Sequence, residues 1–115
     1  MNYLQVNMTK SVYRLTADAK ADLIEIRRYS VKSWGAVRSQ AYLSGLKETI
    51  QRLAEFPLIG EARMDIADSV FSFPYVSHMI YYTLINHQDH HLLLVFAVIH
   101  QSRTPVLHLE KRIKL

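Results

Sequence analysis

The chain has 115 residues, of which 50% are hydrophobic, with a formal net charge of +4, a pI near 9.5 and no cysteine. This length predicts one domain with one modest core, and the lack of cysteine excludes disulfides and thiolate chemistry. No apolar run reaches the roughly 18 residues that a membrane span needs, and the start lacks the pattern of a signal peptide. We therefore expect a cytoplasmic protein whose basic charge favours an acidic protein, nucleic acid or a nucleic-acid machine as partner.

The chain begins with a segment that has no clear periodicity. We expect residues 1–11 to be a flexible extension and residues 12–115 to form the single domain. Within the domain, Val12-Tyr13-Arg14-Leu15 alternates weakly and is short. This pattern predicts a first strand at or near the edge of a sheet.

Two long helices are predicted next. Thr16 is a suitable N-cap for a helix over 17–34, because its hydroxyl can accept from an unpaired N–H one turn ahead. Gly35 can take the left-handed conformation that closes a helix. A second helix begins near Ala36 and ends at Phe56-Pro57, since proline disfavours helix in the residue before it. Helices joined by so short a link fold back as an antiparallel hairpin.

The second half of the chain predicts strands. After a loop over 58–69, strands are expected over 70–75, 78–85 and 92–99, joined by a turn at Val76-Ser77 and a polar loop over 86–90. Short connections predict an antiparallel meander. The tail after Pro105 is basic and is expected to form a short strand or a short helix. From Lys111 onward it is either a solvated end or a segment that binds DNA or an acidic patch of a partner. The element order β–α–α–β–β–β predicts a two-layer α+β fold, with the helical hairpin packed on an antiparallel sheet.

The run from Leu92 to Ile99 is apolar at every position. A strand with one wet face alternates, so this run predicts a central strand that is covered on both faces. The helical hairpin can cover one face of the sheet. We therefore expect a second molecule to cover the other face, and the isolated chain to expose a large apolar patch.

The ordered residues also resemble a known family, the ParE branch of the RelE/ParE toxin superfamily of type II toxin–antitoxin modules. The resemblance covers about residues 12–103. It is carried by residues of every predicted element, namely Tyr13-Arg14-Leu15-Thr16, Ala19, Asp22-Leu23, Ile26, Tyr29, Trp34-Gly35, Tyr42, Leu46, Ile50, Leu53, Phe56-Pro57, Gly60, Phe73-Pro74, Ile80, Tyr82 and His100.

This resemblance implies a toxin that is held inactive by a cognate ParD-like antitoxin in a hetero-oligomeric complex. The implied target of the ParE branch is DNA gyrase, with DNA contacted only indirectly through the complex and no cofactor required. The alternative is a RelE-like endonuclease that cleaves messenger RNA on the ribosome. That reaction needs cations around the phosphate and a group that activates the ribose hydroxyl. RelE-like chains tend to carry arginine before the strand at Ile80, whereas this chain has His78 and Met79.

The candidate residues for target binding are Arg63, His78, His100 and Arg103. Each has a simpler interpretation. Arg63 is either a solvated loop residue paired with Glu61 or Asp65 or a contact residue, and His100 either caps the core or contacts the target. The same four residues are the ones that could supply a nuclease site.

The candidate residues for antitoxin binding are Tyr29, Trp34, Tyr42, Met79 and Tyr81, since aromatic side chains dominate binding hot spots. Tyr29, Trp34 and Tyr42 can equally serve the packing of the hairpin. His87, His90 and His91 lie close in sequence, but they lack the spacing and cysteines of a structural metal site. We expect them to be loop histidines and predict no metal centre.

Overall fold

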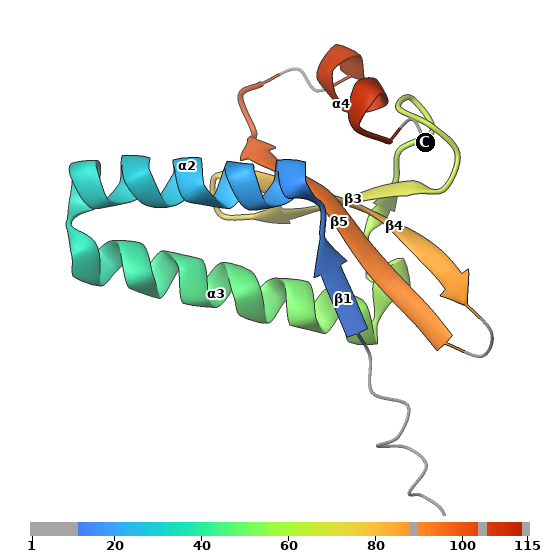
Figure 1. The fold of residues 1–115 in the computed structure, drawn as a ribbon, viewed down its shortest axis with the longest axis horizontal. Helices are drawn as coiled ribbons and strands as arrows, with labels where there is room; N and C mark the ends of the chain where they lie inside the picture. Colours follow the sequence, from blue (N-terminus) through green and yellow to red (C-terminus); the bar gives the residue numbers. More distant parts are fainter. Residues whose placement is uncertain (1–11, 88–89, 104–105, 114–115) are drawn as a thin grey trace, which may run out of the picture.

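A computed structural model describes residues 12–87, 90–103 and 106–113 of the chain (Figure 1). The predicted extension over residues 1–11 lies outside the described residues. The elements in chain order are β1 (Val12–Leu15), α2 (Ala17–Trp34), α3 (Ala36–Glu55), the single 3-10 turn η1 (Pro57–Ile59), β2 (Glu61–Ala62), β3 (Val70–Tyr75), β4 (His78–His87), β5 (His90–His100) and α4 (Val106–Ile113).

The two long helices begin and end where local signals place them. The hydroxyl of Thr16 accepts from the N–H of Ala19 at 3.1 Å and caps α2. Gly35 has φ of 92°, a conformation that glycine adopts without strain, and α3 starts directly after it. Pro57 follows the last residues of α3. The predicted hairpin is therefore confirmed.

The sheet has five strands in the order β1-β5-β4-β3-β2. The predicted meander of β3, β4 and β5 is antiparallel, and β2 adds a short strand inside the predicted loop. The prediction of a wholly antiparallel sheet is wrong at β1, which pairs with β5 in parallel, Val12 opposite Leu92. No tight turn links these two strands, so nothing local fixes their relative direction.

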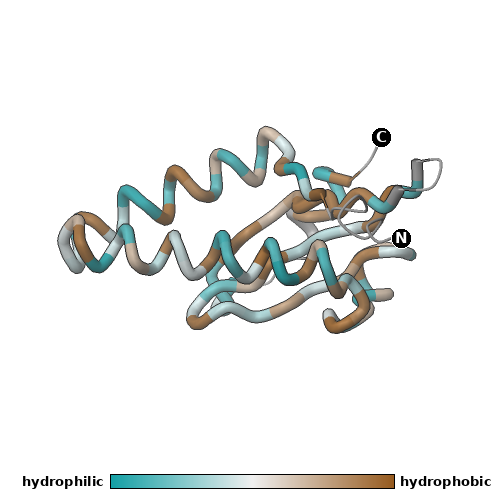
Figure 2. Tube along the Cα trace, turned by 90° about the horizontal axis from the view of Figure 1, so that it is seen from below, coloured by the Kyte–Doolittle hydropathy of each residue, from teal (hydrophilic) through white to brown (hydrophobic). Residues whose placement is uncertain are grey.

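The hairpin covers one face of the sheet, and its helices alternate hydrophilic and hydrophobic residues along their length (Figure 2). The side chains of Leu46, Ile50 and Leu53 of α3 are buried against Val95 and Tyr82 of the sheet. This cluster is the main core. The apolar stripe of the second helix therefore packs as its periodicity predicts.

The part of the opposite face around Phe96 and Tyr81 is covered by the chain itself, so the prediction that only a second molecule could cover that face is wrong. Helix α4 lies at the upper end of the sheet in Figure 1, and its residues Leu109 and Ile113 pack with Phe96 and Tyr81. Phe96 is 1% exposed. Leu109 and Ile113 are one helical turn apart, so a short basic tail still presents an apolar side.

An ion pair fastens α4 to α2. The guanidinium of Arg112 donates to both carboxylate oxygens of Asp22, at 2.7 and 3.1 Å, and to the carbonyl of Phe96 at 3.2 Å. The same carboxylate accepts from the N–H of Val98 at 2.9 Å. Asp22 thus joins the first helix, the last helix and β5.

Among the described helices, none has a stretch apolar and long enough to pass through a bilayer.

Candidate functional site

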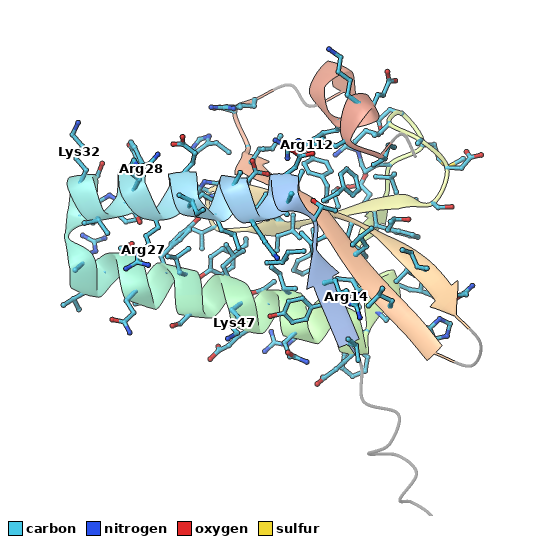
Figure 3. All side chains as sticks on the ribbon, in the orientation of Figure 1. Arg14, Arg27, Arg28, Lys32, Lys47 and Arg112 are labelled. Atoms are coloured by element: carbon cyan, nitrogen blue, oxygen red, sulfur yellow. The ribbon has the colours of Figure 1, made fainter. Side chains whose placement is uncertain are left out.

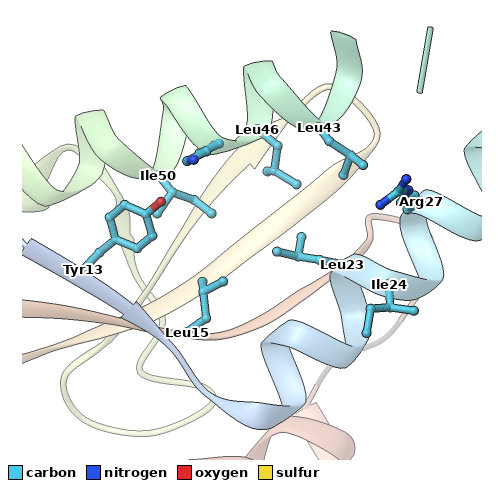
Figure 4. A pocket seen from close by; sticks show the side chains of 9 residues that line it. Tyr13, Leu15, Leu23, Ile24, Arg27, Leu43, Leu46 and Ile50 are labelled. Atoms are coloured by element: carbon cyan, nitrogen blue, oxygen red, sulfur yellow. The ribbon is translucent and has the colours of Figure 1, made fainter. Parts of the chain in front are cut away.

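A groove opens between the helical hairpin and β1. It has a volume of about 480 Å³, and Figure 4 shows side chains of both helices and of β1 pointing into it. The lining is mostly aliphatic. Two of the lining residues, Arg27 of α2 and Lys47 of α3, are exposed cations. The full lining consists of Tyr13, Leu15, Leu23, Ile24, Arg27, Leu43, Leu46, Lys47 and Ile50.

Strand β1 borders this groove and forms one edge of the sheet. Its described pairing partner is β5, and no other described strand pairs with it. Val12 and Arg14 are exposed on it. An edge strand of this kind offers unpaired backbone groups to another chain. The groove and the edge together can therefore receive an extended or helical peptide with apolar side chains.

Arg63 is held in place on the face that α4 covers. Its guanidinium makes a two-fold ion pair with the carboxylate of Asp65, both distances being 2.9 Å, and its carbon lies 5.4 Å from the ring centre of Tyr81. The hydrogen bonds that Arg63 donates to the carboxylate of Asp65 raise the pKa of Arg63, and they lower the pKa of Asp65. Of the two acids considered for Arg63, the structure therefore selects Asp65.

Tyr81 and Met79 lie on the same face as Arg63. Tyr81 is 3% exposed beneath α4, and Met79 packs against the same cluster. With α4 in place, the ring of Tyr81 is out of reach of a partner. This burial could not be predicted from the sequence, because the apolar side of α4 contains so few residues.

His78 and His100 lie side by side, next to Tyr42 of α3. They are opposite each other on β4 and β5, with ring centres 5.5 Å apart. The Nδ1 atom of His78 is 2.7 Å from the hydroxyl of Tyr42 on α3, and that hydroxyl accepts from the N–H of Ser77 at 3.3 Å. Burial, followed by the charge of His100, lowers the pKa of His78.

The structure thus joins a predicted antitoxin residue, Tyr42, to two predicted target residues. Arg103 is exposed a few residues beyond β5, and its N–H donates to the carbonyl of His100 at 3.0 Å. His78, His100 and Arg103 therefore lie at one end of the sheet, apart from Arg63. The register of β4 and β5 places the two histidines opposite each other. A correct prediction of how the strands expected over 78–85 and 92–99 pair would therefore have identified this cluster.

Tyr29 and Trp34 lie farther along the hairpin. Their rings pack edge to face at 6.3 Å, and Trp34 also contacts the ring of Tyr42 at 5.6 Å. Tyr29 is 65% exposed. These aromatic residues pack against one another and still present open faces.

Asp22 and Arg112 were not predicted as site residues. From the sequence, Asp22 is an acidic residue near the N-terminus of the helix predicted over 17–34, and Arg112 is one of the cations of the basic tail. Their pairing across 90 positions has no sequence signal. Within the described ranges, no three potential ligands gather as a metal ion would require. His91 bonds to Asn86 at 2.8 Å, while the side chains of His87 and His90 lie outside the description.

Comparison with known proteins places this geometry in context. A family model described as the ParE toxin of the type II toxin–antitoxin system parDE matches residues 13–105. The chain is 31% identical to Toxin ParE1 of Caulobacter vibrioides over 97 residues, which is 84% of this chain and 96% of that protein. It is 46% identical to Toxin ParE of Escherichia coli over 44 residues, which is 38% of this chain and 43% of that protein.

Two solved structures share the fold. A chain of the chromosomal ParDE system from P. aeruginosa superposes with a TM-score of 0.65 at 14% identity, covering 80% of this chain and 97% of that one. A chain of the toxin–antitoxin complex RelBE2 from Mycobacterium tuberculosis superposes with a TM-score of 0.57 at 16% identity, covering 80% and 99%. These matches confirm the predicted fold class.

Proposed function

This chain belongs to the ParE toxin family of type II toxin–antitoxin systems, and from that premise we propose that it inhibits DNA gyrase by binding and is neutralised by a ParD-like antitoxin. In this proposal the toxin needs no catalysis of its own. The contact surface for gyrase is the end of the sheet around His78, His100 and Arg103, with Arg63 on the adjoining face.

One observation carries the preference for binding over cleavage, the two-fold ion pair between Arg63 and Asp65. A nuclease of this fold must hold cations against a phosphate as negative charge builds up on it. The guanidinium of Arg63 already has a carboxylate as partner. Arg112 is likewise paired, with Asp22. Both guanidinium groups would have to lose a carboxylate before they could stabilise a phosphate.

For the antitoxin, we assign the groove between α2, α3 and β1 as the docking site of a ParD-like segment. The solved relatives are described as toxin–antitoxin systems or complexes, which supports a protein occupant. The aliphatic lining suits the apolar side of an amphipathic helix, and Arg27 and Lys47 suit acidic residues beside it. A strand that continues from that helix could then pair with the edge of β1 that no described strand occupies.

The decisive experiment is a gyrase supercoiling assay with the purified protein. We expect the protein to inhibit supercoiling of relaxed plasmid and to leave broken DNA after the gyrase is digested. The double variant His100→Ala/Arg103→Ala should lose inhibition, whereas Lys111→Ala, which removes an exposed cation of α4, should retain it. Full supercoiling at excess wild-type protein would refute the proposed target.

A second candidate function is messenger RNA cleavage, and the histidine pair favours it. Two imidazoles 5.5 Å apart, one of them bonded to a tyrosine hydroxyl, are groups that can act as general base and general acid. The test is to add the protein to a translating extract and map the ends of the messenger. Cleavage that His78→Gln abolishes, with gyrase unaffected, would reverse the order of the two candidates.

A further inference from the structure

The free end of the helical hairpin projects beyond the sheet (Figures 1 and 3). We call residues 27–42 the hairpin tip. Every residue from Val31 to Arg38 is exposed, so the outer part of the tip packs on no other part of the described fold. The helices are held together there from the inside, by a hydrogen bond between the buried hydroxyls of Ser30 and Ser39. The outward side chains of the tip are thus not needed to close the hairpin.

The tip carries charge of a single sign. Between Glu25 and Glu48 the sequence has no acidic residue, and its charged residues are Arg27, Arg28, Lys32, Arg38 and Lys47. Because the whole chain has a net charge of +4, the remainder of the molecule is close to neutral. Solvated helices usually mix opposite charges one turn apart, which stabilises them. A helical segment without any acid gives up this stabilisation and gains a strong local field.

Aromatic faces lie among these cations. Tyr29 is 65% exposed and Trp34 is 38% exposed. The guanidinium carbon of Arg38 lies 5.7 Å from the ring centre of Trp34. Arg28 has an acidic neighbour, Glu25, at 3.5 Å, but both side chains are largely exposed, so this pair is weak. Open rings beside guanidinium groups form the kind of surface on which unpaired bases stack.

We propose that the hairpin tip binds single-stranded nucleic acid. Arg28, Lys32 and Arg38 contact its phosphates, and a base stacks on the exposed ring of Tyr29, beside Trp34. An acidic protein would satisfy the cations but would gain nothing from the aromatic faces, and a duplex keeps its bases stacked internally. The five residues named for this binding do not line the groove between α2, α3 and β1, and they are not among the residues proposed to contact gyrase.

Trp34 supplies a direct measurement, because the chain has one tryptophan and it lies at the tip. The full-length protein is titrated with single-stranded oligothymidylate, with oligouridylate, with a duplex of equal length and with polyglutamate. We expect either or both single strands to quench the tryptophan fluorescence. The logarithm of affinity should fall against the logarithm of salt with a slope of about −2, from three cations. Equal affinity for polyglutamate or for the duplex, or no quenching by either single strand, overturns the proposal.

Matched variants locate the site by anisotropy of a labelled oligonucleotide. The triple variant Arg28→Gln/Lys32→Gln/Arg38→Gln should weaken binding by about tenfold or more. The control Arg14→Gln/Arg52→Gln/Lys111→Gln removes equal charge from exposed sites off the tip and should change affinity far less. Tyr29→Ala, which leaves every charge in place, should weaken binding by about fivefold. Equal losses in the two triple variants would show attraction by net charge alone and refute the site.

Discussion

At the scale of single residues, Gly45 shows how the side chain of a tyrosine restricts which residue a neighbouring helix can have at one position. A Cβ atom at this position of α3 would lie 2.2 Å from the hydroxyl of Tyr75 and 3.2 Å from its Cζ. That hydroxyl donates to the carbonyl of Tyr42 at 2.9 Å, so it cannot move freely. Glycine is thus required in the middle of α3, although it costs the helix about 1 kcal/mol relative to alanine.

Gly45→Ala should therefore lower the free energy of unfolding by about 1–3 kcal/mol, despite the better helix propensity of alanine. In a Tyr75→Phe background the clashing oxygen is gone, and the same substitution should cost markedly less. Urea unfolding of the four proteins measures the coupling. Equal cost in both backgrounds would show that Tyr75 is not the obstacle.

His78 gives the fold a dependence on pH. Burial and the neighbouring charge of His100 lower its pKa in the folded state, while Asp22 opposes the shift. The unfolded chain then binds a proton more readily than the folded one, so stability contributed by neutral His78 falls as the pH drops through about 6.5 and below.

We expect the free energy of unfolding of the wild type to decrease between about pH 7.5 and pH 5, and the decrease to be smaller in His78→Gln. Chemical denaturation at several pH values measures both slopes, and the difference between them isolates His78 from the other histidines. Identical slopes would mean that His78 titrates alike in both states.

At the scale of elements, α4 determines whether the second face of the sheet is open. Its hold depends on Leu109 and Ile113 and on the ion pair of Arg112 with Asp22, whose side chains are 23% and 13% exposed. Removal of one member of such a pair leaves the other charge without a partner.

Arg112→Gln should therefore destabilise the protein by about 1–3 kcal/mol and speed hydrogen exchange along β5 and in α4. The control Lys111→Gln removes an exposed cation of the same helix and should stay within about 0.5 kcal/mol of wild type. If the two variants have the same free energy of unfolding, the ion pair between Arg112 and Asp22 does not stabilise the fold.

At the scale of the whole molecule, the groove proposed as the antitoxin docking site is formed by three elements together, because α2, α3 and β1 all line it. Arg27→Glu/Lys47→Glu should weaken binding of a ParD-like antitoxin by about 10–100-fold while leaving the fold intact, since both side chains are exposed. Calorimetry with the purified antitoxin measures this. The control Lys20→Glu/Arg52→Glu, which makes the same charge change at exposed helix positions outside the lining, should bind as wild type. Unchanged affinity of the groove variant would exclude the proposed docking site.

How far the sequence predicts this molecule depends on the range of the interactions. The helix ends follow from Thr16, Gly35 and Pro57, each of which acts on its nearest neighbours, and they were predicted correctly. The parallel pairing of β1 and the docking of α4 join distant parts of the chain, and local patterns say nothing about them. For the same reason, the contact between Tyr42 and His78 could not be predicted from the sequence, because only tertiary packing makes them neighbours.

The pairing of β1 with β5 has a consequence for the timing of biosynthesis. Val12 leaves the ribosome early, whereas its partner Leu92 is among the late residues to be translated. Until that partner emerges, β1 lacks its described backbone partner, and the sheet that packs on the hairpin is incomplete. Most of the chain must therefore be translated before β1 can form its described backbone pairing, so the sheet is completed only late in synthesis.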